Sequence, residues 1–183
     1  VMSHGSSKNV VRGSRHEYVF GEKIGEGASC KVFRGLNTTT GEIVALKQVT
    51  NSHDSGDEQS SIVEKEIELL RRLSHRNIVR YIEMLREETS LCIVLEFVEG
   101  GSVATNLKKF GKFPESLCAV YLKQVLFGLE YLHKCSVIHR DVKGANILVT
   151  KTGQVMLADF GISLGASDIH DDTGGGSPYW LAP

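Results

Sequence analysis

Runs of β-forming residues separated by turn-forming residues dominate the first half of the chain. Thr40-Gly41, for example, separates two such runs, as expected of antiparallel strands joined by a short turn. Two later runs, residues 147–150 and 155–157, flank Lys151-Thr152-Gly153 and predict a β-hairpin. The first half of the chain is predicted to form a five-stranded sheet from residues 18–23, 31–36, 42–48, 78–86 and 91–98.

Residues 1–17 lack this pattern. They are rich in Ser, Gly, Lys and Arg and show little periodicity, so we expect a flexible leader with His4 and His16 in solvent. The folded domain is then predicted to cover residues 18–183.

Apolar residues at helical spacing predict one helix inside the sheet region. After a polar loop at residues 51–60, residues 62–73 place Val63, Ile67 and Leu70 on one face. The first half of the chain is therefore predicted to combine five strands with one helix.

The second half is predicted to be mainly helical, which makes the fold class α+β. Ser102 can cap a short helix that ends at Phe110, and Pro114 suits the first turn of a longer helix at residues 115–133. The longer helix carries an apolar stripe that we expect to lie in the core: Cys118, Leu122, Val125, Leu129 and Leu132.

Composition excludes several function classes. With 183 residues, 41% of them hydrophobic, the chain can bury a sizeable core, and its net charge of −1 does not suggest a nucleic-acid partner. The longest purely apolar run, residues 91–95, is too short to span a membrane. Four cysteines without C-x-x-C spacing, in a chain without a secretory signal, predict reduced thiols in the cytoplasm and no zinc site.

A glycine-rich segment, Gly25-Glu26-Gly27-Ala28-Ser29-Cys30, joins the first two predicted strands. Small residues there let backbone amides approach phosphate oxygens. Taken alone, the segment could also be a plain glycine hairpin. A dinucleotide-binding fold is disfavoured, because it requires a helix after the glycine-rich turn and no helical pattern follows here. We also hypothesise that Cys30 is an oxidation- or electrophile-sensitive thiol, with a small apolar filler as the alternative.

The segment His139-Arg140-Asp141-Val142-Lys143-Gly144-Ala145-Asn146 brings together the residue types needed for phosphoryl transfer. An aspartate can accept the proton of an attacking hydroxyl, a lysine can neutralise the moving phosphoryl group, and an asparagine can hold a metal ion. The pattern H-R-D-x-K-x-x-N resembles the catalytic loop of the eukaryotic protein kinases.

Four further motifs occur in the order expected of that family. They are Ile24-Gly25-Glu26-Gly27, Val44-Ala45-Leu46-Lys47, Asp159-Phe160-Gly161 and Ala182-Pro183. The resemblance implies a two-lobed protein-kinase fold, with an N-lobe at residues 18–98 and part of a C-lobe at residues 99–183. It also implies ATP and Mg²⁺ as cofactors and a protein as substrate.

The resemblance assigns roles residue by residue. Asp141 and Lys143 would act on the transferring group, Asn146 and Asp159 would ligate Mg²⁺, and Lys47, held by Glu66, would bind the α- and β-phosphates. Leu95 would be the gatekeeper, with Glu96 and Val98 contacting adenine through their backbones. The implied ATP-binding set is Ile24, Gly25, Glu26, Gly27, Ala28, Val32, Ala45, Lys47, Leu95, Glu96, Val98 and Leu148.

Lys143, together with Ser177-Pro178-Tyr179-Trp180-Leu181-Ala182-Pro183, resembles the serine/threonine kinases. Within them, Lys143-Gly144-Ala145-Asn146 is similar to the mitogen-activated-protein-kinase kinase kinases and sterile-family kinases. Residues 113–126 resemble the fungal septation kinases and the plant epsilon-type members. A downstream kinase is therefore the expected substrate.

Arg140 implies control by phosphorylation of the activation loop, with Thr173 and then Ser167 as candidates. The chain stops at Pro183, where the family pattern continues with a glutamate, so we expect a fragment with low stability and weak activity. A pseudokinase scaffold is the alternative function, although Lys47, Asp141, Asn146 and Asp159 are all retained.

Overall fold

The computed structural model describes residues 10–13, 16–27, 30–50, 70–87 and 90–159. The predictions made for His4, Ala28, Glu66, Ser167 and Thr173 lie outside these ranges. Contacts divide the chain into a first unit, Val1–Gly56 with Tyr81–Phe97, and a second unit, Asp57–Arg80 with Val98–Pro183.

The second unit includes residues 70–80, which the sequence placed in the N-lobe. Packing explains the difference, because Leu73 and Ile78 belong to the apolar cluster of the second unit. The backbone N–H of Leu157 also donates to the carbonyl of Asn77 at 2.9 Å. Ile78 forms an isolated bridge with Leu157, so the strand predicted at residues 78–86 begins only at Tyr81.

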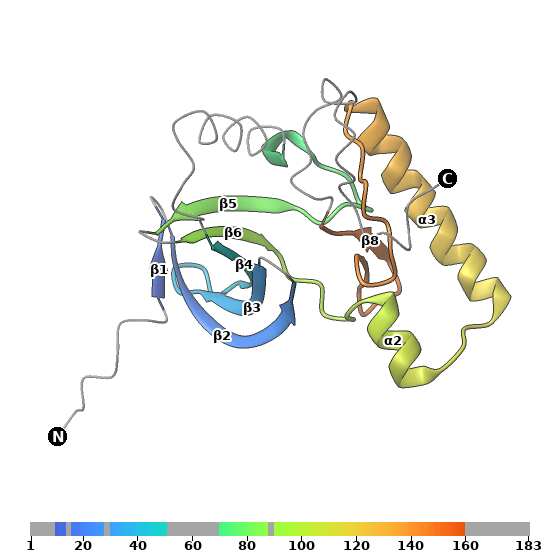
Figure 1. The fold of residues 1–183 in the computed structure, drawn as a ribbon, viewed down its shortest axis with the longest axis horizontal. Coiled ribbons are helices and arrows are strands. Elements are labelled where there is room, and N and C mark those ends of the chain that lie inside the picture. Colours follow the sequence, from blue (N-terminus) through green and yellow to red (C-terminus); the bar gives the residue numbers. More distant parts are fainter. Residues whose placement is uncertain (1–9, 14–15, 28–29, 51–69, 88–89, 160–183) are drawn as a thin grey trace. The chain divides into compact units, whose positions relative to one another are not determined.

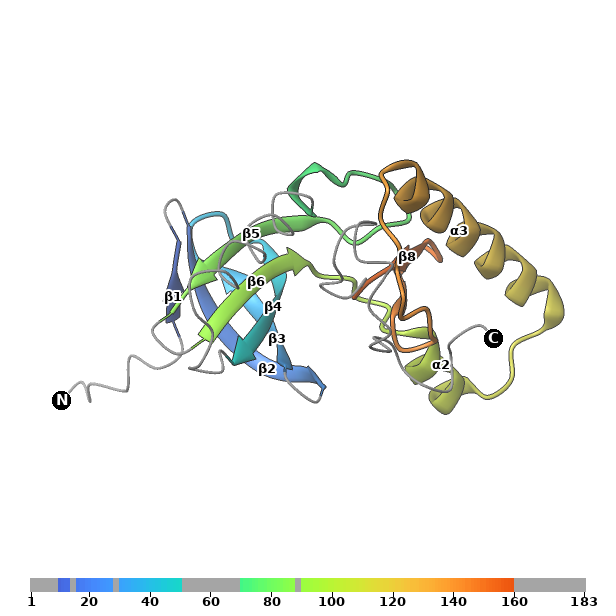
Figure 2. The ribbon, with the colours of Figure 1, turned by 45° about the horizontal axis from the view of Figure 1, so that its top comes forward.

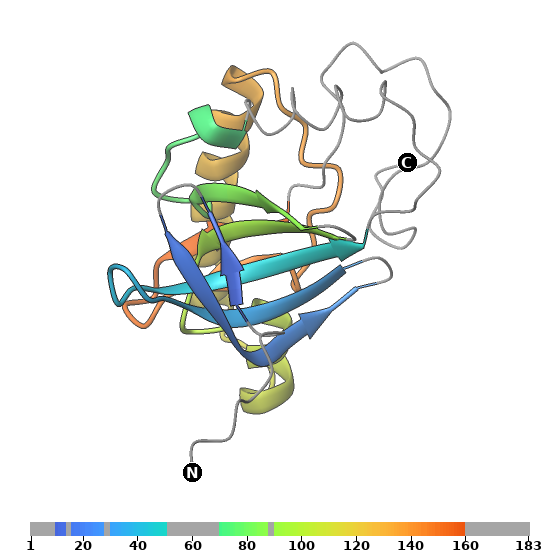
Figure 3. The ribbon, with the colours of Figure 1, turned by 90° about the vertical axis from the view of Figure 1, so that its left-hand side faces the viewer.

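The first unit is built on a curled antiparallel sheet with the strand order β1-β2-β3-β4-β6-β5 (Figures 1 and 3). Neighbouring strands along the chain pair directly, except that β4 pairs with β6. The strands are β1 (Val10–Arg12), β2 (Glu17–Glu26), β3 (Cys30–Asn37), β4 (Ile43–Thr50), β5 (Tyr81–Arg86) and β6 (Ser90–Glu96).

Strand β1 makes this a six-stranded sheet and corrects the prediction of a flexible leader for residues 10–12, whereas residues 1–9 lie outside the described ranges. Val11 is 3% exposed and packs in the core of the first unit, while Arg12 Nε contacts Glu17 Oε1 at 2.7 Å. His16 is not fully in solvent either, since its Nδ1 lies 3.1 Å from Glu83 Oε1. A three-residue strand is too short to show periodicity, and its partners lie farther along the chain.

The side chains of β4 alternate between the two faces of the sheet. Val44 and Leu46 are fully buried in the core of the first unit, next to Cys92 and Val94 of β6. Because side chains alternate along a strand, Ala45 and Lys47 lie on the opposite face. The same burial raises the pKa of the Cys92 thiol to about 12, since an apolar surrounding disfavours the thiolate.

The described residues of the second unit include two helices and a β-hairpin besides the helical residues 70–72, and the predicted bounds of the two helices and the hairpin are nearly those observed (Figure 2). The elements are α2 (Val103–Phe110), α3 (Glu115–Lys134), β7 (Ile147–Val149) and β8 (Val155–Leu157). Ser102 caps α2 by accepting from the N–H of Thr105, as predicted, whereas Pro114 stands at the N-cap position of α3. Residues 70–72 are helical, as predicted for the end of the helix at residues 62–73, whereas residues 62–69 lie outside the described ranges.

Helix α3 is less buried than its sequence predicted. Val125 and Leu132 lie in the core of the second unit, and Leu129 packs against it. Cys118 is exposed, and Leu122 is 58% exposed, so the prediction that the whole stripe lies in the core is wrong for these two residues. Over the residues that the structure describes, no helix is long and apolar enough to cross a membrane.

Candidate active site

The first unit places four of the predicted nucleotide-binding residues on one face of its sheet. Lys47 pairs with Val32 of β3 and with Ile93 of β6, and Ala45 pairs with Leu95. Directly paired residues of antiparallel strands project to the same side. Val32, Ala45, Lys47 and Leu95 therefore share the face opposite the core.

The glycine-rich turn continues from this face between β2 and β3. Gly25 pairs with Val32, and the N–H of Gly27 donates to the carbonyl of Cys30 at 2.8 Å. The register shifts on either side of Lys23, so the strand is irregular where it enters the turn. Cys30 is partly buried, and its sulfur would lie 3.1 Å from a Cβ at Gly27, which favours glycine there.

The other residues of the predicted ATP-binding set that remain to be placed are Glu96, Ile24, Val98 and Leu148. Glu96 ends β6, where it pairs with Val44, and Ile24 of β2 is 45% exposed. Val98 is buried, and Leu148 pairs with Met156 in the β7–β8 hairpin.

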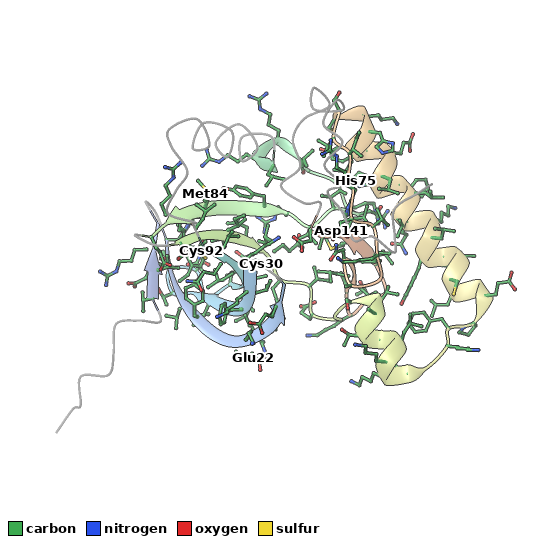
Figure 4. The ribbon with its side chains drawn as sticks, in the orientation of Figure 1. Glu22, Cys30, His75, Met84, Cys92 and Asp141 are labelled. Carbon is green, nitrogen blue, oxygen red and sulfur yellow. The ribbon has the colours of Figure 1, made fainter. Side chains whose placement is uncertain are left out.

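Asp141, which Figure 4 labels, stands in a tight turn of the second unit. Its N–H donates to the carbonyl of His139 at 2.8 Å, and Arg140 between them has a φ of 60°. His139 is 1% exposed, and this burial lowers the pKa of its imidazole. The buried, neutral imidazole therefore supports the turn in a fixed position.

Two predicted site residues converge on the Asp141 side chain. The buried Asn146 donates from Nδ2 to both Oδ2 and the backbone oxygen of Asp141, each at 2.8 Å. Lys143 Nζ lies 2.7 Å from the same Oδ2 atom. Both cationic and neutral donors thus fix the orientation of this carboxylate.

Asp159 is brought to the same loop through the backbone. The N–H of Ala158 donates to the carbonyl of Asn146 at 2.8 Å, and Asp159 follows with a φ of 55°. Because the amide nitrogen of Asn146 is directed at Asp141, its amide oxygen remains to ligate a metal. An amide oxygen and an exposed carboxylate are hard oxygen donors of the kind that Mg²⁺ takes, so these residues fit the implied ion.

A polar network supporting this loop was not found from the sequence. The side chain of Asn77, 1% exposed, donates to the carbonyl of Val155 at 2.7 Å. Gln124 Oε1 of α3 accepts from the N–H of Val155 at 3.0 Å and lies 3.4 Å from Asn77 Nδ2. These contacts join α3 to the hairpin that leads to Asp159, and only the tertiary fold reveals them.

Comparison with known proteins identifies the family of the chain. Residues 18–183 match the protein kinase domain family. The chain is 49% identical over 172 residues to MAP3K epsilon protein kinase 2 of Arabidopsis thaliana, covering 92% of this chain and 12% of that protein. It is 48% identical over 172 residues to mitogen-activated protein kinase kinase kinase ANP1 of the same plant, covering 89% and 26% respectively.

A fungal protein is equally similar. Cell division control protein 7 of Schizosaccharomyces pombe is 49% identical over 163 residues, covering 89% of this chain and 15% of that protein. The chain therefore spans about a quarter or less of each of these relatives, and the predicted resemblance to kinases of the mitogen-activated-protein-kinase kinase kinase type is confirmed. On the family match and these relatives, this chain belongs to the protein kinase domain family.

Proposed function

We propose that this chain carries the catalytic residues of a protein serine/threonine kinase of the mitogen-activated-protein-kinase kinase kinase type. The observation that carries the proposal is the Asp141 carboxylate, which Asn146 and Lys143 contact at 2.8 Å and 2.7 Å through the same oxygen. A carboxylate held in this way can orient a hydroxyl group and accept its proton.

In the proposed reaction, the oxygen of a substrate Ser or Thr attacks the γ-phosphorus of ATP, and the bond to the β–γ bridging oxygen breaks. The hydroxyl proton passes to Asp141, and ADP leaves. Lys143 balances the negative charge of the transferring group from its place beside Asp141. Asn146 and Asp159 would hold Mg²⁺, which neutralises charge on the phosphates.

The first unit contributes binding rather than chemistry. Lys47 would hold the α- and β-phosphates, and the apolar face formed by Val32, Ala45 and Leu95 suits a planar base. The glycine-rich turn would approach the phosphates with backbone N–H groups. We propose a downstream kinase as substrate, on the names of the relatives, and a cytoplasmic location, which is consistent with four free cysteines.

Phosphate transfer from Mg-ATP to a generic protein substrate tests the proposal, using the full gene product that carries this chain. We expect Asp141→Asn to lower the rate about a thousandfold, because the amide cannot accept the proton. Glu130→Gln is the matched control. It makes the same acid-to-amide change at an exposed position of α3, where Glu130 forms an ion pair with Lys134 at 2.7 Å, and it should leave the rate unchanged.

Equal transfer by Asp141→Asn and the unchanged protein would contradict the assigned role. Absence of transfer by all three proteins, with ATP binding retained, would favour a nucleotide-binding scaffold instead.

A further inference from the structure

The end of helix α2 and the turn after it carry a cationic and apolar surface that the proposed chemistry does not use. Residues 103–114 contain three lysines and no aspartate or glutamate. We call this surface the α2 basic patch, and it consists of Leu107, Lys108, Lys109, Phe110 and Lys112. All five residues are exposed.

The apolar members of the patch are unusually open. Phe110 is 68% exposed and Leu107 is 42% exposed, and α2 has no buried residue. The Lys109 ammonium lies 5.1 Å from the centroid of the Phe110 ring, so charge and aromatic surface are adjacent. An exposed aromatic ring next to cationic groups can contact a partner through both apolar and electrostatic forces.

Helix stability alone does not explain this composition. Lys108 and Lys109 in the last turn interact favourably with the helix dipole. Lys112 lies beyond the helix, after the Gly111 C-cap with its φ of 78°, and receives no such benefit. Exposure of Phe110 contributes nothing to folding either, because its ring remains largely in water.

The patch is held on a rigid support. The Ser102 cap fixes the start of α2, and Asn106 Nδ2 donates to the carbonyl of Gly100 at 3.1 Å. Beyond the patch, the Phe113 ring meets Tyr121 of α3 edge to face, with centroids 5.9 Å apart. Figures 1 and 2 show the end of α2 leading into the α3 loop, away from the β7–β8 hairpin.

This support also contacts the catalytic loop, because the N–H of Ala104 in α2 donates to the carbonyl of Gly144 at 2.8 Å. A partner bound at the far end of α2 would thus contact a helix that is hydrogen-bonded to the loop that carries Asp141. The C-terminal end of this eight-residue helix would then bind the partner, and its N-terminal end would support the loop.

We propose that the α2 basic patch binds an acidic peptide segment of another protein, with an apolar side chain of that segment against Phe110 and Leu107. Three cations match carboxylates in charge, and the two apolar side chains provide area for one or two apolar residues. A membrane surface is the less favoured partner, because anionic lipids typically require more cationic residues and a longer amphipathic helix. The proposal concerns binding and does not depend on phosphate transfer.

The test is fluorescence anisotropy with a labelled peptide, Glu-Glu-Leu-Glu-Glu-Phe-Glu-Glu, titrated with the purified protein. We expect the double variant Lys108→Glu/Lys109→Glu to weaken binding about tenfold or more, because it replaces attraction with repulsion. Phe110→Ser should also weaken binding, since it removes the apolar contact. The matched control is Lys134→Glu/Lys151→Glu, which makes the same change in net charge at exposed sites elsewhere in the second unit.

Retained binding by the control, with loss in both patch variants and unchanged far-ultraviolet circular dichroism, supports the proposal. Equal weakening by the two double variants would show attraction by net charge alone and would overturn it. Absence of peptide binding, or binding only to vesicles of phosphatidylserine with the same dependence on Lys108 and Lys109, would overturn it as well.

Discussion

The two units position their functional side chains by different means. In the first unit, Lys47 and its neighbours are placed by the hydrogen-bonded ladder of β3, β4 and β6, which depends on the backbone. In the second unit, Asp141 is placed by side-chain contacts from Asn146 and Lys143, next to Arg140, a non-glycine residue with a φ of 60°. The sheet should therefore tolerate the loss of single polar side chains better than the loop does.

Substitution of glycines at close contacts should give the largest difference in stability between the two units. A Cβ at Gly100 would lie 2.1 Å from the carbonyl oxygen of Val149 in β7, a backbone atom that cannot move aside without disturbing the hairpin. We expect Gly100→Ala to destabilise the second unit by about 3 kcal/mol. Gly25→Ala is the counterpart in the first unit, where the new Cβ would make an ordinary contact of 3.6 Å with Val32, and we expect a change below about 1 kcal/mol.

Urea denaturation, with hydrogen exchange read separately in β7 and β3, measures both effects. The comparison between the units would fail if Gly25→Ala destabilised the protein as much as Gly100→Ala.

Much of this architecture could be predicted because local signals and tertiary demands agree. The helix from Glu115 to Lys134 was predicted within one residue of its end, since Pro114 and the apolar periodicity both mark it. The β7–β8 hairpin was predicted equally well, with Gly153 supplying a φ of 81° in its turn. The contacts of Asp141 with Lys143 and Asn146 could be anticipated because these three residues lie close together in the sequence.

The parts that were missed depend on contacts between distant segments. Val11 becomes part of the core only because β1 pairs with β2, and nothing within three residues signals that pairing. Asn77 and Gln124 lie 47 positions apart and reach one another through the β8 backbone. Leu122 is an error in the other direction. Its helical spacing predicted burial, but the side chain is 58% exposed.

Two side-chain amides, Asn146 in the second unit and Gln48 in the first, should differ by an intermediate amount in their contribution to stability. Asn146→Ala removes the donor to both the carboxylate and the backbone oxygen of Asp141, and we expect a loss of about 1 to 3 kcal/mol in stability. Gln48 in β4 donates to Ser90 and Glu87 at 3.2 and 3.3 Å, but the strand ladder already holds its position. Gln48→Ala should therefore lower stability by only about 0.5 kcal/mol.

Phosphate transfer sharpens this test, because Asn146→Ala should lower the rate strongly whereas Gln48→Ala should leave it nearly unchanged. Equal transfer by the two variants would show that Asp141 does not need the Asn146 contact for its orientation.

Acid should weaken the second unit through His139, and this is the smallest of the expected effects. Burial lowers the pKa of the folded His139 imidazole below its ordinary value, so between the two values the unfolded chain binds more protons than the folded one. The contribution of neutral His139 to stability is thus fully present above about pH 6.5, the ordinary value, and is lost as the pH falls below it. His75, in the same unit, has its pKa lowered by burial and by Arg76 and adds to the loss.

This pH dependence is measured by urea denaturation at about pH 7.5 and at about pH 5.5, two values on either side of the ordinary histidine pKa. His139→Asn keeps an acceptor for the N–H of Asp141, which lies 3.3 Å from His139 Nδ1, but removes the titrating ring, so the pH dependence should become shallower. The same pH dependence in His139→Asn and in the unchanged protein would place the acid sensitivity outside His139. The backbone hydrogen bonds alone would then hold the Asp141 turn, and the loop would resemble the sheet more closely than its contacts indicate.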